Sequence, residues 1–315
     1  MQNLLWWRAP LVAAIVSLGV VSCSKNASPP PASNATETPP SGANTPVAAG
    51  NGAPQIVLSA DQVHIEYHVY GKGEPAVILI HGWACDGNYW NAQIEDLKAK
   101  YTTVTVDLAG HGASTSNRTD WSIGNFGEDV AAVARQLQSS KIVLVGHSMG
   151  APVALEAARR IGDRVIGIIA VDSLKTIGQP PPSEQQIQVR LKPFRDNFIG
   201  HTREFVASAM FQPDANKAFV QKVAYDMSLE SPAVAIPAME SLSRMDFARL
   251  LPEIHVPIVA INSALGPPVD EARIRKVIPG FHATTLEHTG HFLMMEAPER
   301  FNPILLKEID ALVSK

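Results

Sequence analysis

The sequence lacks the common signatures of nucleotide and metal chemistry. It contains no Walker-type loop, no dinucleotide-binding glycine fingerprint, no His-Glu-x-x-His helix and no paired Cys-x-x-Cys motif, so we expect neither a cofactor nor a metal ion. An excess of positive charge is also missing, because 26 Lys and Arg are balanced by 30 Asp and Glu, which leaves a formal net charge of −4. Nucleic acid is therefore not an expected partner.

Cysteine is scarce, and the first of the two cysteines follows an apolar segment. Arg8 precedes the apolar stretch 9–21, which is the pattern of a secretion signal. The segment 20–23, Val-Val-Ser-Cys, resembles a bacterial lipobox, in which the cysteine becomes the lipidated first residue of the mature protein. We therefore expect a signal peptide over residues 1–22 and a lipid anchor on Cys23 that holds the protein on a membrane.

This anchor predicts a lipoprotein of the bacterial cell envelope. By analogy with lipoproteins, Ser24 in the place of an aspartate favours the outer membrane, with the protein facing the periplasm. The alternative is an uncleaved anchor over residues 4–21, with Arg8 reaching back to the membrane surface. If Cys23 carries lipid, only Cys85 remains and no intrachain disulfide can form; we expect Cys85 to be a small buried filler.

Residues 24–54 contain almost no large apolar side chains. Pro, Ala, Ser, Asn, Thr and Gly dominate, and such a segment cannot bury enough surface to offset its chain entropy. We predict that residues 23–54 form the lipid anchor and a disordered tether.

From about Gln55 the pattern becomes that of a folded α/β domain. Continuous apolar strands separated by amphipathic helices are typical of a parallel sheet that is covered on both faces. A core over residues 55–172 and 256–315 follows. Strands are predicted at 63–69, 76–80, 102–106, 142–145, 165–171, 256–261 and 283–286, and helices at 89–100, 126–138, 152–161 and 298–313.

The alternation is interrupted over residues 173–255. Three prolines at 180–182 are followed by helical patterns that are rich in Phe and Met. We interpret this stretch as a helical cap inserted above the sheet. Most of its Phe and Met side chains should form its core, and a minority should line an acyl pocket.

The most informative motif is Gly-His-Ser-Met-Gly at 146–150, which lies between a predicted strand and a predicted helix. Small residues two positions before and after Ser148 allow a sharp turn that lifts the hydroxyl above the sheet. Ser148 is therefore the candidate nucleophile, and the Met149 amide a candidate donor to an oxyanion.

A serine needs a base, and His291 is the candidate. It lies on the loop after the last predicted strand, from which it can reach back over the carboxyl edge of the sheet; His288 is the local alternative. The Trp83 amide, after the strand 76–80, would complete a two-donor oxyanion hole with Met149. We expect Asp107 to pin a glycine-rich loop and His81 to brace its own loop, both in structural roles.

In chain order, these motifs resemble those of the α/β-hydrolase superfamily. The resemblance rests on His-Gly-Trp at 81–83, Asp-x-x-Gly-His-Gly at 107–112, the pentapeptide 146–150, and Gly-His-Phe at 290–292 before Glu-Ala-Pro-Glu at 296–299, and it covers about residues 60–313. It implies a mostly parallel eight-stranded sheet with helices on both faces and a helical cap after strand six. A serine at position 148, rather than an aspartate, argues against haloalkane dehalogenase or epoxide hydrolase chemistry.

The acid of the triad departs from the family pattern. Relatives most often place it shortly after strand seven, but residues 262–266 contain no carboxylate. Asp172 ends the predicted strand 165–171 on the same edge as Ser148, a position that some relatives use, and a strand end is a rigid platform. We predict Asp172 as the acid; Asp270 is the alternative, and a Ser–His dyad is a third possibility.

These residues predict a serine hydrolase that cleaves a carboxylic ester or similar small acyl substrate through an acyl-enzyme. A cofactorless C–C bond hydrolase or a perhydrolase would use the same triad. A ligand-binding or signalling protein of this fold would keep the pocket with little turnover.

Overall fold

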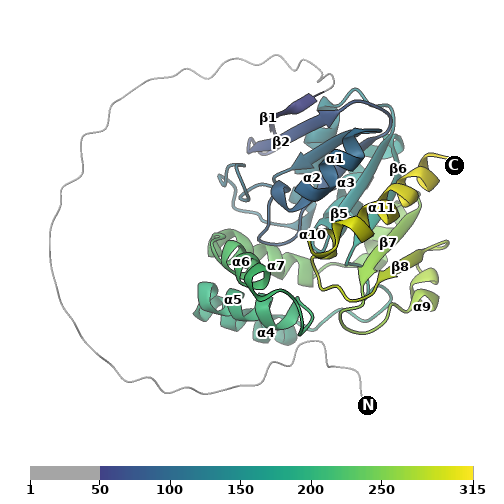
Figure 1. Cartoon of the computed structure of the whole chain (residues 1–315). Coiled ribbons are helices and arrows are strands. Elements are labelled where there is room, and N and C mark those ends of the chain that lie inside the picture. The colour runs from purple at the N-terminus through teal and green to yellow at the C-terminus, as the bar shows by residue number, and fades with distance from the viewer. Residues whose placement is uncertain (1–49, 315) are drawn as a thin grey trace, which may run out of the picture. The chain divides into compact units, whose positions relative to one another are not determined.

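The computed structural model describes residues 50–314, a sheet with helices on both sides and a further group of helices at one end (Figure 1). The predicted signal peptide, Cys23 and the tether up to residue 49 lie outside the described residues. Between residues 50 and 314, no helix is both long enough and apolar enough to cross a membrane.

Eight strands form one sheet. They are β1 Gly50–Leu58, β2 His64–Gly71, β3 Ala76–Ile80, β4 Thr102–Val106, β5 Ile142–His147, β6 Val165–Val171, β7 Ile258–Ser263 and β8 His282–Leu286. Their order in the sheet is β1-β2-β4-β3-β5-β6-β7-β8. The pairs β1–β2 and β2–β4 are antiparallel, and every other neighbouring pair is parallel. The predicted mostly parallel eight-stranded sheet is confirmed.

Helices cover the sheet and explain its uninterrupted apolar strands. The helices of the core are α1 Asn91–Lys98, α2 Ile123–Gln136, α3 Gly150–Ile161, α9 Glu271–Arg275, α10 Leu293–Glu296 and α11 Pro298–Val313, with the short 3-10 turns η1 Gly87–Trp90 and η2 Gly162–Arg164. α2 packs against α3, and α1 packs against α11. Because layers of helices cover both faces, every residue of β3 and β5 is buried.

Five helices lie between β6 and β7, within the stretch predicted as a cap. They are α4 Glu184–Asp196, α5 Phe198–Ala209, α6 Lys217–Ser228, α7 Pro232–Ser243 and α8 Phe247–Leu250, followed by the 3-10 turn η3 Leu251–Glu253. A capping box between Ser183 and Gln186 starts α4 directly after the proline run. Buried Phe and Met side chains hold these helices together, namely Phe194, Phe198, Phe205, Phe211, Met227 and Met239.

Most of the predicted elements differ from the observed ones by one to three residues at one end or both, and two differences in the sheet have a physical reason. β1 starts at Gly50, so residues 50–54 belong to the sheet and not to the tether. β7 starts at Ile258 because Pro257 has no amide hydrogen for the ladder, and it continues to Ser263. Most of β1 is exposed, and only its last three residues have large apolar side chains, so its sequence has neither the alternation nor the longer apolar run by which a strand is recognised.

Candidate active site

Ser148 lies on a sharp turn between β5 and α3. Its φ angle of 52° is in the left-handed region, where non-glycine residues are uncommon. The flanking glycines are required by space: a Cβ on Gly146 would lie 2.2 Å from the Gly150 carbonyl oxygen, and one on Gly150 would lie 2.4 Å from the Ile80 carbonyl oxygen. The Ser148 amide donates to the Val171 carbonyl over 2.9 Å, which ties the turn to the neighbouring strand.

Asp172 and His291 meet in a short hydrogen bond. The distance between His291 Nδ1 and Asp172 Oδ2 is 2.6 Å. A carboxylate can only accept here, so Nδ1 carries the proton and Nε2 of the neutral ring is left as an acceptor. β5 pairs with β6 in a register that aligns His147 with Val171, so Ser148 and Asp172 follow directly at the ends of two adjacent parallel strands.

The backbone on both sides of His291 is held by other segments. Its amide donates to the Met210 carbonyl over 2.7 Å, just after α5. Glu296 accepts from the Gly290 amide over 2.9 Å and from the Phe292 amide over 3.2 Å. Burial raises the pKa of Glu296, and these two amide bonds oppose that shift. The loop is therefore fixed from the inserted helices and from α10 together.

The carboxylate of Asp172 is surrounded by hydrogen-bond donors from His291, Ser263 and Lys175. Its φ angle is 44°, and its amide donates to the Ile261 carbonyl over 2.9 Å. Oδ1 accepts from the amide and the hydroxyl of Ser263 over 2.9 and 2.8 Å, and Lys175 Nζ lies 2.8 Å away. Burial alone would raise the pKa of Asp172, but the hydrogen bond and charge of His291, followed by Lys175, hold it well below its usual range.

His147 supports the same loop from behind. Its Nε2–H donates to the His291 carbonyl over 2.8 Å, while Nδ1 is buried and has no partner among the described residues. Burial, and then the nearby His291, lower the pKa of His147 to about 3. His147 is therefore neutral at physiological pH and adds no charge to the site.

The loop after β3 lies against the serine. A Cβ on Gly82 would lie 3.2 Å from Ser148 Cβ and 2.9 Å from His147 Nδ1, so only glycine allows this approach. Trp83 follows it, and the Trp83 indole Nε1–H donates to the Ala235 carbonyl in α7 over 2.6 Å. Met149, directly after the serine, is fully buried. Met149 thus follows Ser148 directly in the chain, and the approach of Gly82 brings the loop that carries Trp83 against the serine.

Two further residues have the structural roles expected of them. Asp107 accepts from the amides of Gly87 and Ala113, both over 2.8 Å, and so pins its glycine-rich loop. His81 Nδ1–H donates to the Gly82 carbonyl over 2.8 Å, and its Nε2 accepts from the Leu108 amide over 3.0 Å. His81 therefore braces the loops after β3 and β4.

The alternative residues lie away from this arrangement. Asp270 is the N-cap of α9, where it accepts from the Arg273 amide over 2.9 Å and pairs with the Arg273 guanidinium at 3.4 Å. His288 is exposed. Cys85 is buried, and burial raises the pKa of its thiol well above the usual value, in keeping with a filler and not a reactive group.

Sequence reasoning missed four residues around the triad: Lys175, Ser263, Glu296 and His147. Lys175 and Ser263 contact Asp172 from the loop after β6 and from the end of β7, and no local motif links them. Glu296 and His147 carried a signal, because they belong to the Glu-Ala-Pro-Glu segment and to the pentapeptide 146–150 that were quoted for the family resemblance.

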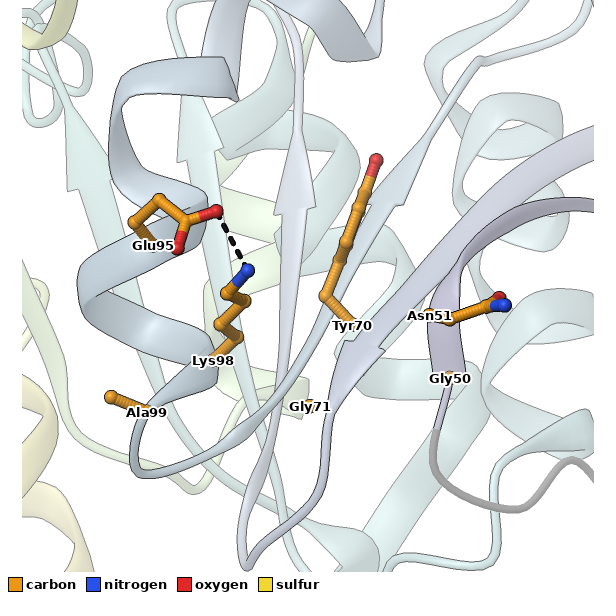
Figure 2. Close-up of a pocket in the computed structure, with 7 residues that line it drawn as sticks. All are labelled: Gly50, Asn51, Tyr70, Gly71, Glu95, Lys98 and Ala99. Carbon is orange, nitrogen blue, oxygen red and sulfur yellow. Dashed lines mark hydrogen bonds and ion pairs between the residues drawn. The ribbon is translucent and has the colours of Figure 1, made fainter.

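A separate surface pocket of about 420 Å³ lies where β1 and β2 meet the end of α1 (Figure 2). Glu95 and Lys98 form an ion pair of 2.6 Å at its rim. Its lining contains neither serine nor histidine, so it offers none of the chemistry found around Ser148. The lining residues are Gly50, Asn51, Tyr70, Gly71, Glu95, Lys98 and Ala99.

Comparisons with known proteins identify the family and the fold. Residues 77–304 match the model of the alpha/beta hydrolase family. The 3-oxoadipate enol-lactonase 2 of Acinetobacter baylyi is 26% identical over 251 residues, which cover 78% of this chain and 92% of the lactonase. A karrikin insensitive 2 receptor of Petunia hybrida is 23% identical over 254 residues, which cover 76% of this chain and 94% of the receptor.

A solved structure has the same fold. The thermophilic esterase from Thermogutta terrifontis aligns with a TM-score of 0.72 and 24% identity, over 82% of this chain and 99% of the esterase.

Proposed function

Because the chain belongs to the alpha/beta hydrolase family, it is a hydrolase, and we propose that it cleaves a small carboxylic ester through an acyl-enzyme on Ser148. The 2.6 Å contact between His291 Nδ1 and Asp172 Oδ2 carries this proposal, because it leaves His291 Nε2 as the base that a serine nucleophile requires. The lactonase and the esterase among the similar proteins support an ester bond as the substrate class.

The reaction has two halves. In the first, His291 Nε2 takes the proton of Ser148 Oγ while Oγ attacks the carbonyl carbon, and the oxyanion accepts hydrogen bonds from the amides of Trp83 and Met149. The imidazolium then protonates the leaving alcohol, and the acyl-enzyme remains. In the second, His291 deprotonates a water that attacks the acyl carbon, and the proton returns to Ser148 as the acid leaves. Asp172 stabilises the imidazolium in both halves.

Aromatic rings next to the oxyanion loop support a small apolar acyl group. The Trp83 ring packs edge-on against Phe194 with 5.6 Å between ring centroids and against Phe198 with 6.1 Å. Both phenylalanines come from the inserted helices. We assign these three rings to the wall of the acyl pocket, since apolar surface next to the nucleophile favours an acyl chain over a charged group.

The lipid anchor remains part of the proposal. We propose that Cys23 is diacylated and tethers the hydrolase to the outer membrane on its periplasmic side, because the cysteine ends an apolar segment and precedes a Pro- and Ser-rich stretch.

The experiment is hydrolysis of p-nitrophenyl esters of increasing acyl length, together with labelling by a fluorophosphonate probe. Ser148→Ala should lower kcat/KM by about 10⁴-fold or more and abolish labelling, because the nucleophile is removed. Ser208→Ala is the matched control, since the Ser208 hydroxyl only donates to the Glu204 carbonyl on the exposed side of α5. Rapid labelling without turnover of any ester would redirect the proposal to another acyl substrate; neither labelling nor turnover would favour a binding protein.

A further inference from the structure

The two oxygens of Asp172 have different partners. Oδ2 accepts from His291, whereas Oδ1 is shared by the amide and hydroxyl of Ser263 and by the Lys175 ammonium. Two neutral donors from Ser263 already satisfy Oδ1. The ammonium is therefore not needed to complete hydrogen bonding, and what it adds at this carboxylate is a positive charge.

Lys175 is held in place for this contact. Its side chain is only 15% exposed, and Nζ also donates to the carbonyls of Ser263 and Leu265 over 3.2 and 3.1 Å. Its own carbonyl accepts from Arg273 Nη2 over 2.7 Å. A charge that is fixed and shielded from solvent acts more strongly on its neighbours than a surface lysine does.

The other ionisable groups that face the triad are few and come from several elements. His147 on β5 is neutral, and Glu296 on α10 is bound to the amides on either side of His291. Arg273 on α9 faces the Lys175 backbone, and its charge is countered by Asp270. Among the contacts of the described residues, Lys175 thus supplies the permanent positive charge that touches the triad carboxylate.

We propose that Lys175 is a positioning residue that partly neutralises Asp172 and thereby keeps His291 unprotonated, and ready to act as a base, at lower pH than an unscreened Asp–His pair would allow. The proposal rests on the triad of the proposed function. The physical reason is competition: Asp172 attracts a proton onto His291, and a cation on the same carboxylate weakens that attraction. The loop that carries Lys175 would then tune the working pH without touching the substrate.

Removal of the Lys175 charge should shift the pH–activity profile in one direction. In Lys175→Met the carboxylate keeps both Ser263 donors but loses the cation, so His291 holds its proton more strongly. The acidic limb of the pH–activity profile should move upward by about one to two pH units, the range that Coulomb's law gives for a single charge roughly 6 to 12 Å away at an effective dielectric constant near 20. Lys175→Gln, which keeps a polar donor without a charge, should behave in the same way, and Lys175→Arg should keep the wild-type limb.

The test uses the full chain and two readouts. The first is the rate constant for inactivation by diethyl 4-nitrophenyl phosphate across the pH range, because this probe reports on Ser148 activation whatever the natural substrate is. The second is the NMR titration of the His291 imidazole, assigned by comparison with His291→Gln. Lys192→Met is the control, since Lys192 pairs with Asp196 on the exposed surface of α4. Thermal denaturation verifies that each variant is folded.

The outcomes separate the two proposals. An upward shift of both readouts in the Met and Gln variants, but not in the Arg and Lys192 variants, supports the role of Lys175. Slower inactivation at every pH with an unmoved limb and an unmoved titration would mean that Lys175 only ties two loops together, and would overturn the inference. If the wild type resists inactivation while its His291 titration still shifts in Lys175→Met, the proposed function fails and the role of Lys175 stands.

Discussion

Two residues of the proposed triad adopt backbone conformations that L-residues rarely take. Ser148 and Asp172 have φ angles of 52° and 44°, and such conformations cost of order 1–3 kcal/mol unless their surroundings impose them. Here the sheet imposes them, because the amide of each residue donates to a carbonyl of the next strand, that of Val171 for Ser148 and that of Ile261 for Asp172. The parallel ladder therefore continues one residue beyond the strands and orients both side chains.

Asp172→Asn should lower kcat by about 10⁴-fold with little loss of stability. The donors of Ser263 and Lys175 favour the asparagine carbonyl at the Oδ1 position, which leaves its NH₂ group facing His291 Nδ1. Nδ1 must then accept, and the proton moves to Nε2, where the base is needed. Steady-state kinetics with a p-nitrophenyl ester measure the loss, and thermal denaturation measures stability.

Asp270→Asn is the matched control for this substitution. Asparagine is as good an N-cap as aspartate, and only the partly exposed pair with Arg273 is lost. The free energy of unfolding should change by less than about 0.5 kcal/mol and kcat should remain near the wild-type value. A large loss in Asp270→Asn with a mild effect of Asp172→Asn would move the acid to Asp270.

The residues of the site differed in how far the sequence could predict them. Ser148 and His291 stand in local patterns, a strand–turn–helix and a loop after the last strand, so short segments were enough to select them. The acid depends on which strand ends reach His291, and sequence alone therefore left Asp172 and Asp270 both open. Lys175 and Ser263 are defined only by their distances to Asp172, which no spacing along the chain encodes.

At the scale of elements, the inserted helices take part in positioning the base. The carbonyl of Met210, after α5, accepts from the His291 amide, and the next residue, Phe211, stacks on Phe292 with 5.5 Å between ring centroids. Gln212 Nε2 donates to the Thr289 carbonyl over 3.3 Å. Three consecutive residues of one segment thus hold the loop that carries the imidazole.

Phe211→Leu should reduce kcat more than its effect on stability would suggest. The smaller side chain loosens the contact with Phe292 and lets the His291 loop move, and small displacements of a catalytic group can cost about 10²-fold in rate. Phe301→Leu is the matched control, because Phe301 is fully buried in α11. Each of the two substitutions should lower the free energy of unfolding by about 1–2 kcal/mol. Equal kcat values in the two variants, measured well below their melting temperatures, would show that the segment at 210–212 does not position the base.

Among the elements, buried strands were predicted more accurately from the sequence than the exposed edge strand β1. The strands 76–80, 102–106 and 165–171 were predicted to the residue, because 76–80 and 165–171 are apolar runs of the kind that is buried on both faces and 102–106 consists of β-branched Thr and Val. β1 was missed since its side chains are mostly exposed: Ile56 is 63% exposed, and glycine, asparagine and proline fill its first half. An edge strand of this kind depends on its pairing with β2 and not on burial.

At the scale of the whole molecule, the catalytic unit and the proposed anchor occupy separate parts of the chain. All proposed site residues lie between Gly82 and Glu296, within the stretch that matches the alpha/beta hydrolase family. Turnover should therefore be independent of the anchor, whereas the location of the protein should depend on it.

Cys23→Ser should move the protein from the membrane fraction to the soluble fraction of a diderm bacterium without changing kcat/KM for a p-nitrophenyl ester. Two acyl chains on Cys23 would hold the protein firmly, since each buried CH₂ group contributes about 0.8 kcal/mol, and serine cannot receive them. Cys85→Ala is the matched control, because it removes the buried cysteine of the folded part and should leave fractionation unchanged. If Cys23→Ser stays in the membrane fraction, residues 4–21 act as an uncleaved anchor instead.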